Sequence, residues 1–168
     1  KLAPTSSTTV QMALGDALAV CLMELKGFKD IDFAKFHPGG SLGKNLTAKV
    51  EQFVSQNKPQ VSPESGIRDV IISVSGSKHG ITVVIENEKI VGVITDGDIR
   101  RMLLNQDDIS KVKASDITSK NPKTIDKNNL AKEAMQILKE FNIGQLVVTD
   151  QGKYYGIIDI HTLLDEGI

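Results

Sequence analysis

Short apolar runs alternate with amphipathic segments along the C-terminal two thirds of the chain. Runs of Val and Ile that end at turn residues predict buried strands, and apolar positions three and four apart predict helices. The pattern predicts a helix, two strands and a helix, and then the same order again. The predicted elements are helix 64–75, strand 81–86, strand 89–94, helix 96–105, helix 130–141, strand 145–149, strand 154–158 and helix 160–165.

These two sets of elements are copies of one another at an offset of 64 residues. Matched positions include Gly80 with Gly144, Val83 with Val147, Val84 with Val148, Lys89 with Lys153, Gly92 with Gly156 and Ile94 with Ile158. A unit of this size cannot bury its own apolar face, so we expect the two copies to pack together. Such a pair has two symmetric clefts, which is typical of a binding module. We assign residues 49–112 to the first repeat and 113–168 to the second.

Residues 1–48 lie outside the repeat and contain a predicted helix at 9–26, which Gly27 ends. Apolar residues surround this helix on nearly every side, and such helices are buried on several faces. Nothing else in residues 1–48 has enough apolar surface to cover it. We therefore expect this segment to be the last part of a larger domain. A turn region at 30–43 and a polar connector at 44–59 lead into the first repeat.

Composition and charge narrow the class of partner. The formal net charge is −1, so we expect neither a nucleic acid nor a membrane as partner. The longest unbroken apolar run, 17–23, is far shorter than the roughly 20 residues of a membrane span. The single Cys21 excludes an internal disulfide and is compatible with a cytoplasmic location. His79 and His161 have no partner at ligand spacing, so we predict no metal site.

The turn into the predicted helix at 96–105 carries the first candidate binding site. Thr95 stands at the N-cap, and the free backbone N–H groups of the first helical turn can bind an anion. Asp98 can accept hydrogen bonds from a ribose diol. The same Thr-x-x-Asp spacing is also a capping box, which needs no ligand. The second repeat has Asp159 and Thr162 at the equivalent positions, so we expect one competent cleft and one weak cleft.

The order of these elements and the segment Gly92-Val93-Ile94-Thr95-Asp96-Gly97-Asp98 resemble the cystathionine-β-synthase (CBS) domain, over roughly residues 48–168. The resemblance implies a tandem CBS pair and an α/β fold, specifically an α+β pair of helix–strand–strand–helix repeats with pseudo-two-fold symmetry. In CBS pairs that bind adenine nucleotides, a glycine, a hydroxyl residue and an aspartate at this spacing contact the ligand. Gly92, Thr95 and Asp98 match them, which implies a nucleotide effector and no required cofactor.

His37 is a candidate catalytic residue because of the loop that follows it. Pro38 favours an extended backbone at His37, and Gly39 and Gly40 let the chain approach a ligand closely. A histidine held there is suited to general acid–base catalysis, and a loop histidine with a structural hydrogen bond is the alternative. The loop is not a nucleotide-triphosphatase P-loop, because that motif needs Gly at position 38 and Ser or Thr at position 45.

Four segments of residues 1–48 resemble the end of a sugar isomerase (SIS) domain. They are 2–9, 15–19, 32–34 and His37-Pro38-Gly39-Gly40 with the following 41–44. Their order, followed by a CBS pair, resembles the arabinose-5-phosphate isomerases (the KpsF/GutQ group) over the whole chain. The resemblance implies interconversion of D-ribulose 5-phosphate and D-arabinose 5-phosphate through an enediol, on the route to Kdo and lipopolysaccharide. It also implies that His37 is an active-site residue, that other catalytic groups lie upstream of Lys1, and that the enzyme is a homo-tetramer.

Two hypotheses follow. In the first, the chain is the C-terminal part of such an isomerase, inactive by itself, with a remnant of an α/β SIS domain and a regulatory CBS pair. Its effector would be an adenine nucleotide or CMP-Kdo, and its sugar-phosphate site could include the hydroxyl cluster Thr5, Ser6, Ser7 and Thr8, although capping of the helix is the favoured role for that cluster. In the second, the chain is a stand-alone nucleotide-sensing or dimerising CBS module. The apolar helix at 9–26 favours the first.

Overall fold

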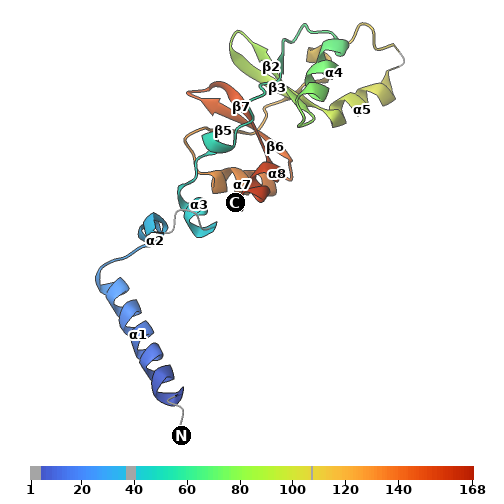
Figure 1. The fold of residues 1–168 in the computed structure, drawn as a ribbon. Coiled ribbons are helices and arrows are strands. Elements are labelled where there is room, and N and C mark those ends of the chain that lie inside the picture. Colours follow the sequence, from blue (N-terminus) through green and yellow to red (C-terminus); the bar gives the residue numbers. More distant parts are fainter. Residues whose placement is uncertain (1–4, 37–40, 107) are drawn as a thin grey trace. The chain divides into compact units, whose positions relative to one another are not determined.

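The structure is a computed structural model that describes residues 5–36, 41–106 and 108–168 (Figure 1). The chain divides into two compact units, and the boundary falls between Thr47 and Ala48. The second unit holds both sequence repeats. The first unit corresponds closely to the segment that the sequence sets apart as residues 1–48.

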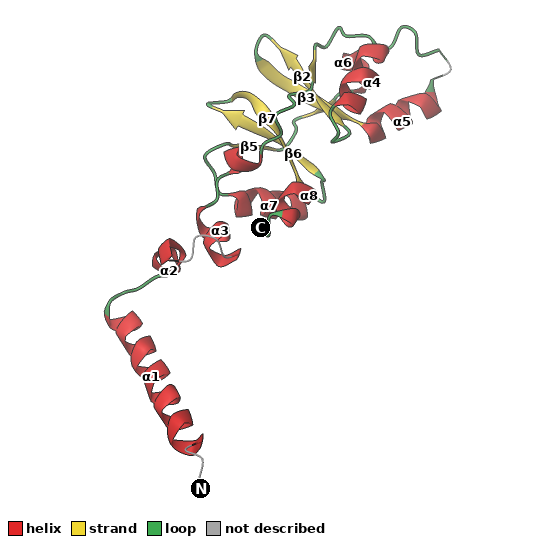
Figure 2. Cartoon of the chain, viewed as in Figure 1, coloured by secondary structure: helices red, strands yellow, loops and turns green. Residues whose placement is uncertain are grey.

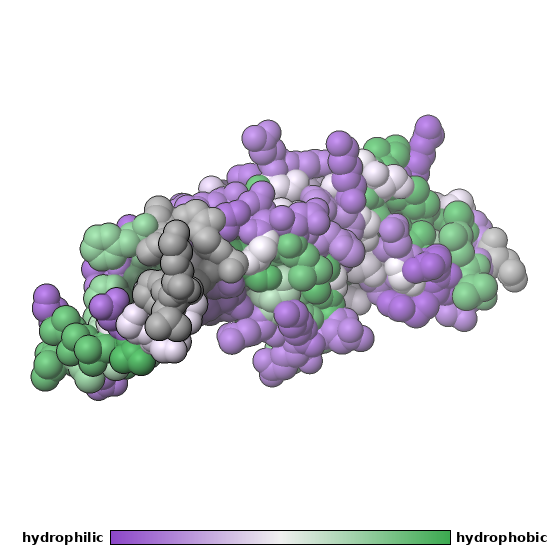
Figure 3. Space-filling view, turned by 60° about the horizontal axis from the view of Figure 1, so that its bottom comes forward, coloured by the Kyte–Doolittle hydropathy of each residue, from purple (hydrophilic) through white to green (hydrophobic). Residues whose placement is uncertain are grey.

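The described residues of the first unit form three helices: α1 (Thr5–Leu25), α2 (Asp30–Phe36) and α3 (Ser41–Thr47). None of the residues of α1 is buried, and hydrophobic surface gathers on the part of the molecule that carries it (Figure 3). By length and composition alone α1 could cross a membrane, but the core helix of a soluble protein meets the same criteria. The unbroken apolar run at 17–23 is shorter than the apolar part of α1, because isolated polar residues interrupt that part of the helix.

The predicted turn region at 30–43 is wrong, because most of its described residues are helical. Asp32 accepts a hydrogen bond from the backbone N–H of Lys29 (3.1 Å) and from the ammonium group of Lys35 (2.9 Å). An acidic side chain in the first turn and a basic one in the last turn both favour a helix. These contacts favour the short α2.

The second unit contains two sheets and the helices that cover them (Figure 2). The first repeat comprises β1 (Gln60–Val61), α4 (Ile67–Gly76), β2 (Ile81–Glu86), β3 (Lys89–Thr95) and α5 (Asp96–Asn105). The second repeat comprises β5 (Thr124–Asp126), α7 (Ala131–Glu140), β6 (Gln145–Asp150), β7 (Lys153–Asp159) and α8 (Ile160–Asp165). Short elements precede each repeat: a 3₁₀ helix, η1 (Val50–Phe53), and then α6 (Ala114–Ile117) with β4 (Ser119–Lys120).

The strand pairing confirms the internal repeat in detail. Ile81 faces Thr95 in the first hairpin, and Gln145 faces Asp159 in the second, which is the same register 64 residues later. Each hairpin also has a bulge at the equivalent place, after Val84 and after Val148. Each repeat has one further strand, β1 or β5, that pairs in parallel with the hairpin. These strands are two and three residues long, too short for the apolar pattern to predict them.

The segments that precede the repeats are exchanged between them. Ala48 and Val50 are buried in the core of the second repeat, among residues such as Leu138 and Ile158. Val112 and Ala114, at the equivalent positions, are buried in the core of the first repeat. The prediction that 44–59 is a polar connector is therefore wrong for its central part, 48–54, which contributes apolar side chains to a core.

A third cluster of apolar side chains joins the two sheets. Ile81 and Val83 of the first repeat pack against Val147 and Ile157 of the second, and all four are buried. Burial of a branched aliphatic side chain stabilises a fold by about 1.5–3 kcal/mol, so this cluster holds the repeats together. Two clefts lie beside this cluster. Each is lined by residues of the cluster and by the end of a strand, Thr95 in one and Asp159 in the other.

Candidate functional site

The first cleft is a cavity of about 400 Å³ lined by both repeats. Its apolar wall consists of Ile81, Val93, Ile143 and Val147, and its polar rim includes Thr95, Ser119, Lys120, Lys123 and Gln145. A larger hollow of about 540 Å³ runs along α4 and β1, but Asp69 is the only charged residue that lines it. The first cleft combines an apolar wall with cationic groups and a helix start, which suits an anionic ligand with a planar apolar part.

Thr95 is placed by the change from strand to helix at the end of β3. It is the N-cap of α5, and its hydroxyl oxygen accepts a long hydrogen bond from the backbone N–H of Asp98 (3.4 Å). The Asp98 carboxylate in return accepts from the Thr95 backbone N–H (2.8 Å). The capping box that the sequence allowed is therefore present.

All acceptor positions of Asp98 are used within the chain. Oδ2 accepts from the backbone and the hydroxyl of Thr95, the latter at 2.6 Å, and Oδ1 accepts from Arg101 (2.5 Å) and Ser119 (3.1 Å). Burial alone would raise the pKa of Asp98, but these hydrogen bonds outweigh it and lower the pKa. Because a carboxylate has about four acceptor sites, a ribose diol can bind Asp98 only by displacing a donor such as Arg101.

Gly92 lies in β3 and faces the segment that crosses from the second repeat. It is the register partner of Lys120, and a Cβ atom at this position would lie 2.5 Å from the carbonyl oxygen of Ser119. A side chain here would push β4 away from β3. The structure thus gives Gly92 a packing role beside the cleft, which the sequence motif alone does not reveal.

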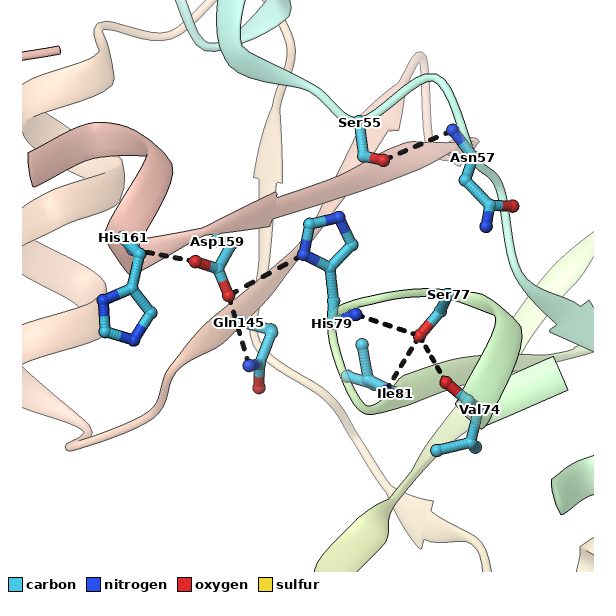
Figure 4. Close-up of polar contacts among 9 residues, drawn as sticks. All are labelled: Ser55, Asn57, Val74, Ser77, His79, Ile81, Gln145, Asp159 and His161. Carbon is cyan, nitrogen blue, oxygen red and sulfur yellow. Dashed lines mark hydrogen bonds and ion pairs between the residues drawn. The ribbon is translucent and has the colours of Figure 1, made fainter. Parts of the chain in front are cut away.

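The second cleft lies at the pseudo-symmetric position and has a volume of about 290 Å³. Asp159 caps α8 there, as Thr95 caps α5, and its carboxylate accepts from the backbone N–H of His161 (2.8 Å). Figure 4 shows the Asp159 carboxylate between His79 and Gln145. The second cleft contains Thr162 and Glu166 where the first repeat has Asp98 and Met102.

His79 contacts the second repeat, which the sequence did not predict. Its Nδ1 lies 3.8 Å from Oδ2 of Asp159, and both side chains are mostly buried. The Ser77 hydroxyl fixes the loop by accepting from the backbone N–H of His79 (3.2 Å). The repeat offset makes His79 equivalent to Ile143 and Asp159 equivalent to Thr95, and Ile143 and Thr95 both line the first cleft. Among the described residues no group of His, Cys, Asp and Glu could hold a metal ion.

The two other candidate sites of the sequence fall in the segment 1–48. His37 falls in 37–40, outside the described residues. Thr5, Ser6, Ser7 and Thr8 form the first turns of α1, and the Thr8 and Thr9 hydroxyls donate to the carbonyl oxygen of Thr5 (2.9 and 3.0 Å). These bonds run back along the helix and do not cap its N–H groups.

The sequence matches the family described as "CBS domain" over residues 50–105 and 114–167. The chain belongs to the CBS-domain family. Solved CBS structures agree with the fold: the CBS domain protein PAE2072 of Pyrobaculum aerophilum, complexed with AMP, has a TM-score of 0.63 at 19% identity and covers 71% of this chain and 97% of its own. CBSX2 in complex with AMP has a TM-score of 0.58 at 22% identity, with 70% and 93% covered.

Curated relatives match nearly the whole chain. The arabinose 5-phosphate isomerase KdsD of Francisella tularensis is 41% identical over 97% of this chain and 51% of its own length. The enzyme of the same name from Pseudomonas aeruginosa is 41% identical over 99% of this chain and 52% of its own length. The chain thus spans about half the length of the curated relatives it matches. The CBS pair accounts for only the later part of each alignment.

Proposed function

We propose that this chain is the C-terminal part of an arabinose-5-phosphate isomerase, in which a regulatory CBS pair follows the end of an SIS domain. The observation that carries the proposal is the match to two such isomerases over nearly all of the chain, at 41% identity. The apolar α1, in which no residue is buried, supports it, because such a helix needs the remainder of a domain to cover it. The whole enzyme would be a cytoplasmic homo-tetramer that interconverts D-ribulose 5-phosphate and D-arabinose 5-phosphate.

His37 is the proposed acid–base residue of that isomerase. Moving a proton between neighbouring carbons needs a group with a pKa near neutrality within hydrogen-bond reach of the substrate. The test replaces His37 with Ala in the enzyme that carries the preceding half, and follows the isomerisation of arabinose 5-phosphate. We expect kcat to fall by roughly 10²-fold or more, and the 168 residues alone to be inactive. Near-normal turnover of the variant would make His37 a structural residue.

The proposed role of the CBS pair is to bind one nucleotide in the first cleft. Its rim carries Lys120, Lys123 and the start of α5, all suited to phosphate, whereas the second cleft carries Asp159 and Glu166. Structural neighbours bind AMP, as their names state. The proposed contact of Gly92 is a close approach of its backbone. Thr95 would donate its hydroxyl to the ligand after releasing Asp98 Oδ2, and Asp98, which lines a neighbouring hollow with Arg101, would reach a ribose after releasing Arg101.

Calorimetry with AMP and with CMP-Kdo tests this role. We expect one site per chain for at least one of the two ligands, and a loss of affinity when Lys120 and Lys123 are both changed to Ala. The matched control changes Lys132 and Lys139 on α7 to Ala and should leave the affinity unchanged. Two equal sites, or no binding of either ligand, would contradict the proposal.

A further inference from the structure

Gln145 connects the two clefts. It lines the cavity of the first, and it is the strand partner of Asp159 in the second. Its amide nitrogen Nε2 donates a hydrogen bond to Asp159 Oδ2 (3.3 Å). Figure 4 shows the amide nitrogen of Gln145 turned toward Asp159 and the amide oxygen turned away from it.

Asp159 determines the orientation of the Gln145 amide group. An ionised carboxylate accepts hydrogen bonds and donates none, so it can pair only with the NH₂ group of the amide. Asp159 is itself held in place, because Oδ1 accepts from the first turn of α8 at His161 (2.8 Å) and His79 lies 3.8 Å from Oδ2. Its side chain is nine-tenths buried, which strengthens these electrostatic contacts.

The consequence is an oriented acceptor beside the first cavity. With the NH₂ group engaged by Asp159, Gln145 presents its carbonyl oxygen to other partners, and within the described chain no donor hydrogen-bonds to that oxygen. The first repeat has Ile81 at the position equivalent to Gln145. Of the two clefts, only the first therefore has a glutamine acceptor at this position, and a residue of the second cleft, Asp159, orients it. A carbonyl oxygen accepts from an amino group and repels another carbonyl.

We propose that Gln145, oriented by Asp159, selects nucleotides whose base carries an exocyclic amino group, adenine or cytosine, over their keto counterparts, hypoxanthine and uracil. This rests on the proposed binding of a nucleotide in the first cleft. Gln145 is the residue that contacts the ligand, and Asp159 is a positioning residue that acts through it. A site that aims an acceptor at an amino group rejects a keto analogue, because two acceptors then face each other without a proton between them.

The experiment measures affinity ratios within matched pairs of ligands. Calorimetry on the 168-residue chain compares AMP with inosine 5′-monophosphate, and CMP with UMP, which differ mainly at the amino or keto group. We expect at least one amino nucleotide to bind about tenfold more tightly than its keto partner. Gln145→Met removes the acceptor, and Asp159→Asn lets the amide turn over, so each should reduce the ratio to about one.

The control variant is Thr162→Ala, which alters the second cleft without touching Gln145 and should keep the ratio. Because Asn at position 159 retains an acceptor for the cap of α8, thermal unfolding of that variant should remain close to that of the parent chain. Equal affinity for amino and keto partners in the parent chain would overturn the inference and leave nucleotide binding intact. An unchanged affinity ratio in both Gln145→Met and Asp159→Asn would likewise overturn the role of Gln145. Absence of any nucleotide binding would overturn both this inference and the proposed nucleotide binding in the first cleft.

Discussion

Thr95 ends β3 beside the first cleft, and Asp159 ends β7 at the same place beside the second. The backbones around them agree in register and even in their bulges. The side chains differ in charge. Lys120 and Lys123 line the first cleft, whereas Asp159 and Glu166 are among the charged groups that line the second cleft. The apolar pattern thus determines the same fold twice, and a few polar positions decide what each cleft can bind.

The largest difference between the clefts is expected at a pair of equivalent glycines. A methyl group at Gly92 would collide with Thr118 and lie 2.5 Å from the backbone carbonyl oxygen of Ser119, whereas at Gly156 it would collide with a side-chain methyl of Val54 and stay 3.5 Å from the nearest backbone atom. A side chain can move aside more easily than a strand. We expect Gly92→Ala to destabilise the chain by about 3 kcal/mol and Gly156→Ala by about 1 kcal/mol, measured by urea unfolding. Equal losses of stability would show that the segments facing the two glycines, at Ser119 and at Val54, move aside equally easily.

The next difference concerns the starts of α5 and α8. Asp98→Ala removes the acidic member of the capping box and the partner of Arg101, and we expect a loss of about 2 kcal/mol in the absence of ligand. Thr162→Ala, at the equivalent position, makes no such change and should stay within about 0.5 kcal/mol of the parent chain. Thermal unfolding of both variants measures the contrast. A comparable loss at Thr162 would mean that α8 depends on a contact of that side chain.

The pH dependence of stability sharpens the same contrast. The pKa of Asp98 is lower in the folded chain than its ordinary value of 3.8, because the hydrogen bonds from Thr95, Arg101 and Ser119 outweigh the effect of burial. A lowered pKa means that Asp98 contributes its stability above the unfolded pKa and loses it as pH falls through the folded one. The stability gap between the parent chain and Asp98→Asn should therefore be full at pH 7 and close below roughly pH 4. A gap that persists at pH 2 would contradict this charge-based account.

The sequence predicted most of this fold because its long elements have clear periodicity. Strand 81–86 and helices 96–105 and 160–165 have the predicted bounds, since Val and Ile runs end at turn residues and Thr95 or Asp159 starts each helix. The short strands β1 and β5 escaped prediction, as did the helices in 30–43. Periodicity also cannot tell which core a segment enters, so the exchange of Ala48 and Val50 into the second repeat was not foreseen.

The candidate sites were predictable only in part, because a motif gives local geometry and not its surroundings. The spacing of Thr95 and Asp98 predicted the capping box that the structure contains. It could not show that Arg101 and Ser119 occupy the remaining acceptor sites of Asp98. The contact of His79 with Asp159 joins two repeats and is invisible to any local pattern. The roles of His37 and of the ligand-binding residues stay predictions.

The smallest effect is expected away from both clefts, at the ion pair between Glu88 and Lys153. It joins Glu88 in the turn of the first hairpin to Lys153 at the start of β7, with 2.6 Å between the ammonium nitrogen and a carboxylate oxygen. It lowers the pKa of Glu88 and raises that of Lys153. Both side chains are about three-quarters exposed, and salt and side-chain entropy cancel most of the gain of such a pair. Lys153→Ala should leave the thermal midpoint unchanged within error at physiological salt, whereas Val147→Ala in the apolar cluster between the sheets should lower it by several degrees. If Lys153→Ala lowered the thermal midpoint as much as Val147→Ala, and high salt removed that effect, the prediction would be wrong. The ion pair, and not the apolar cluster alone, would then hold the two repeats together.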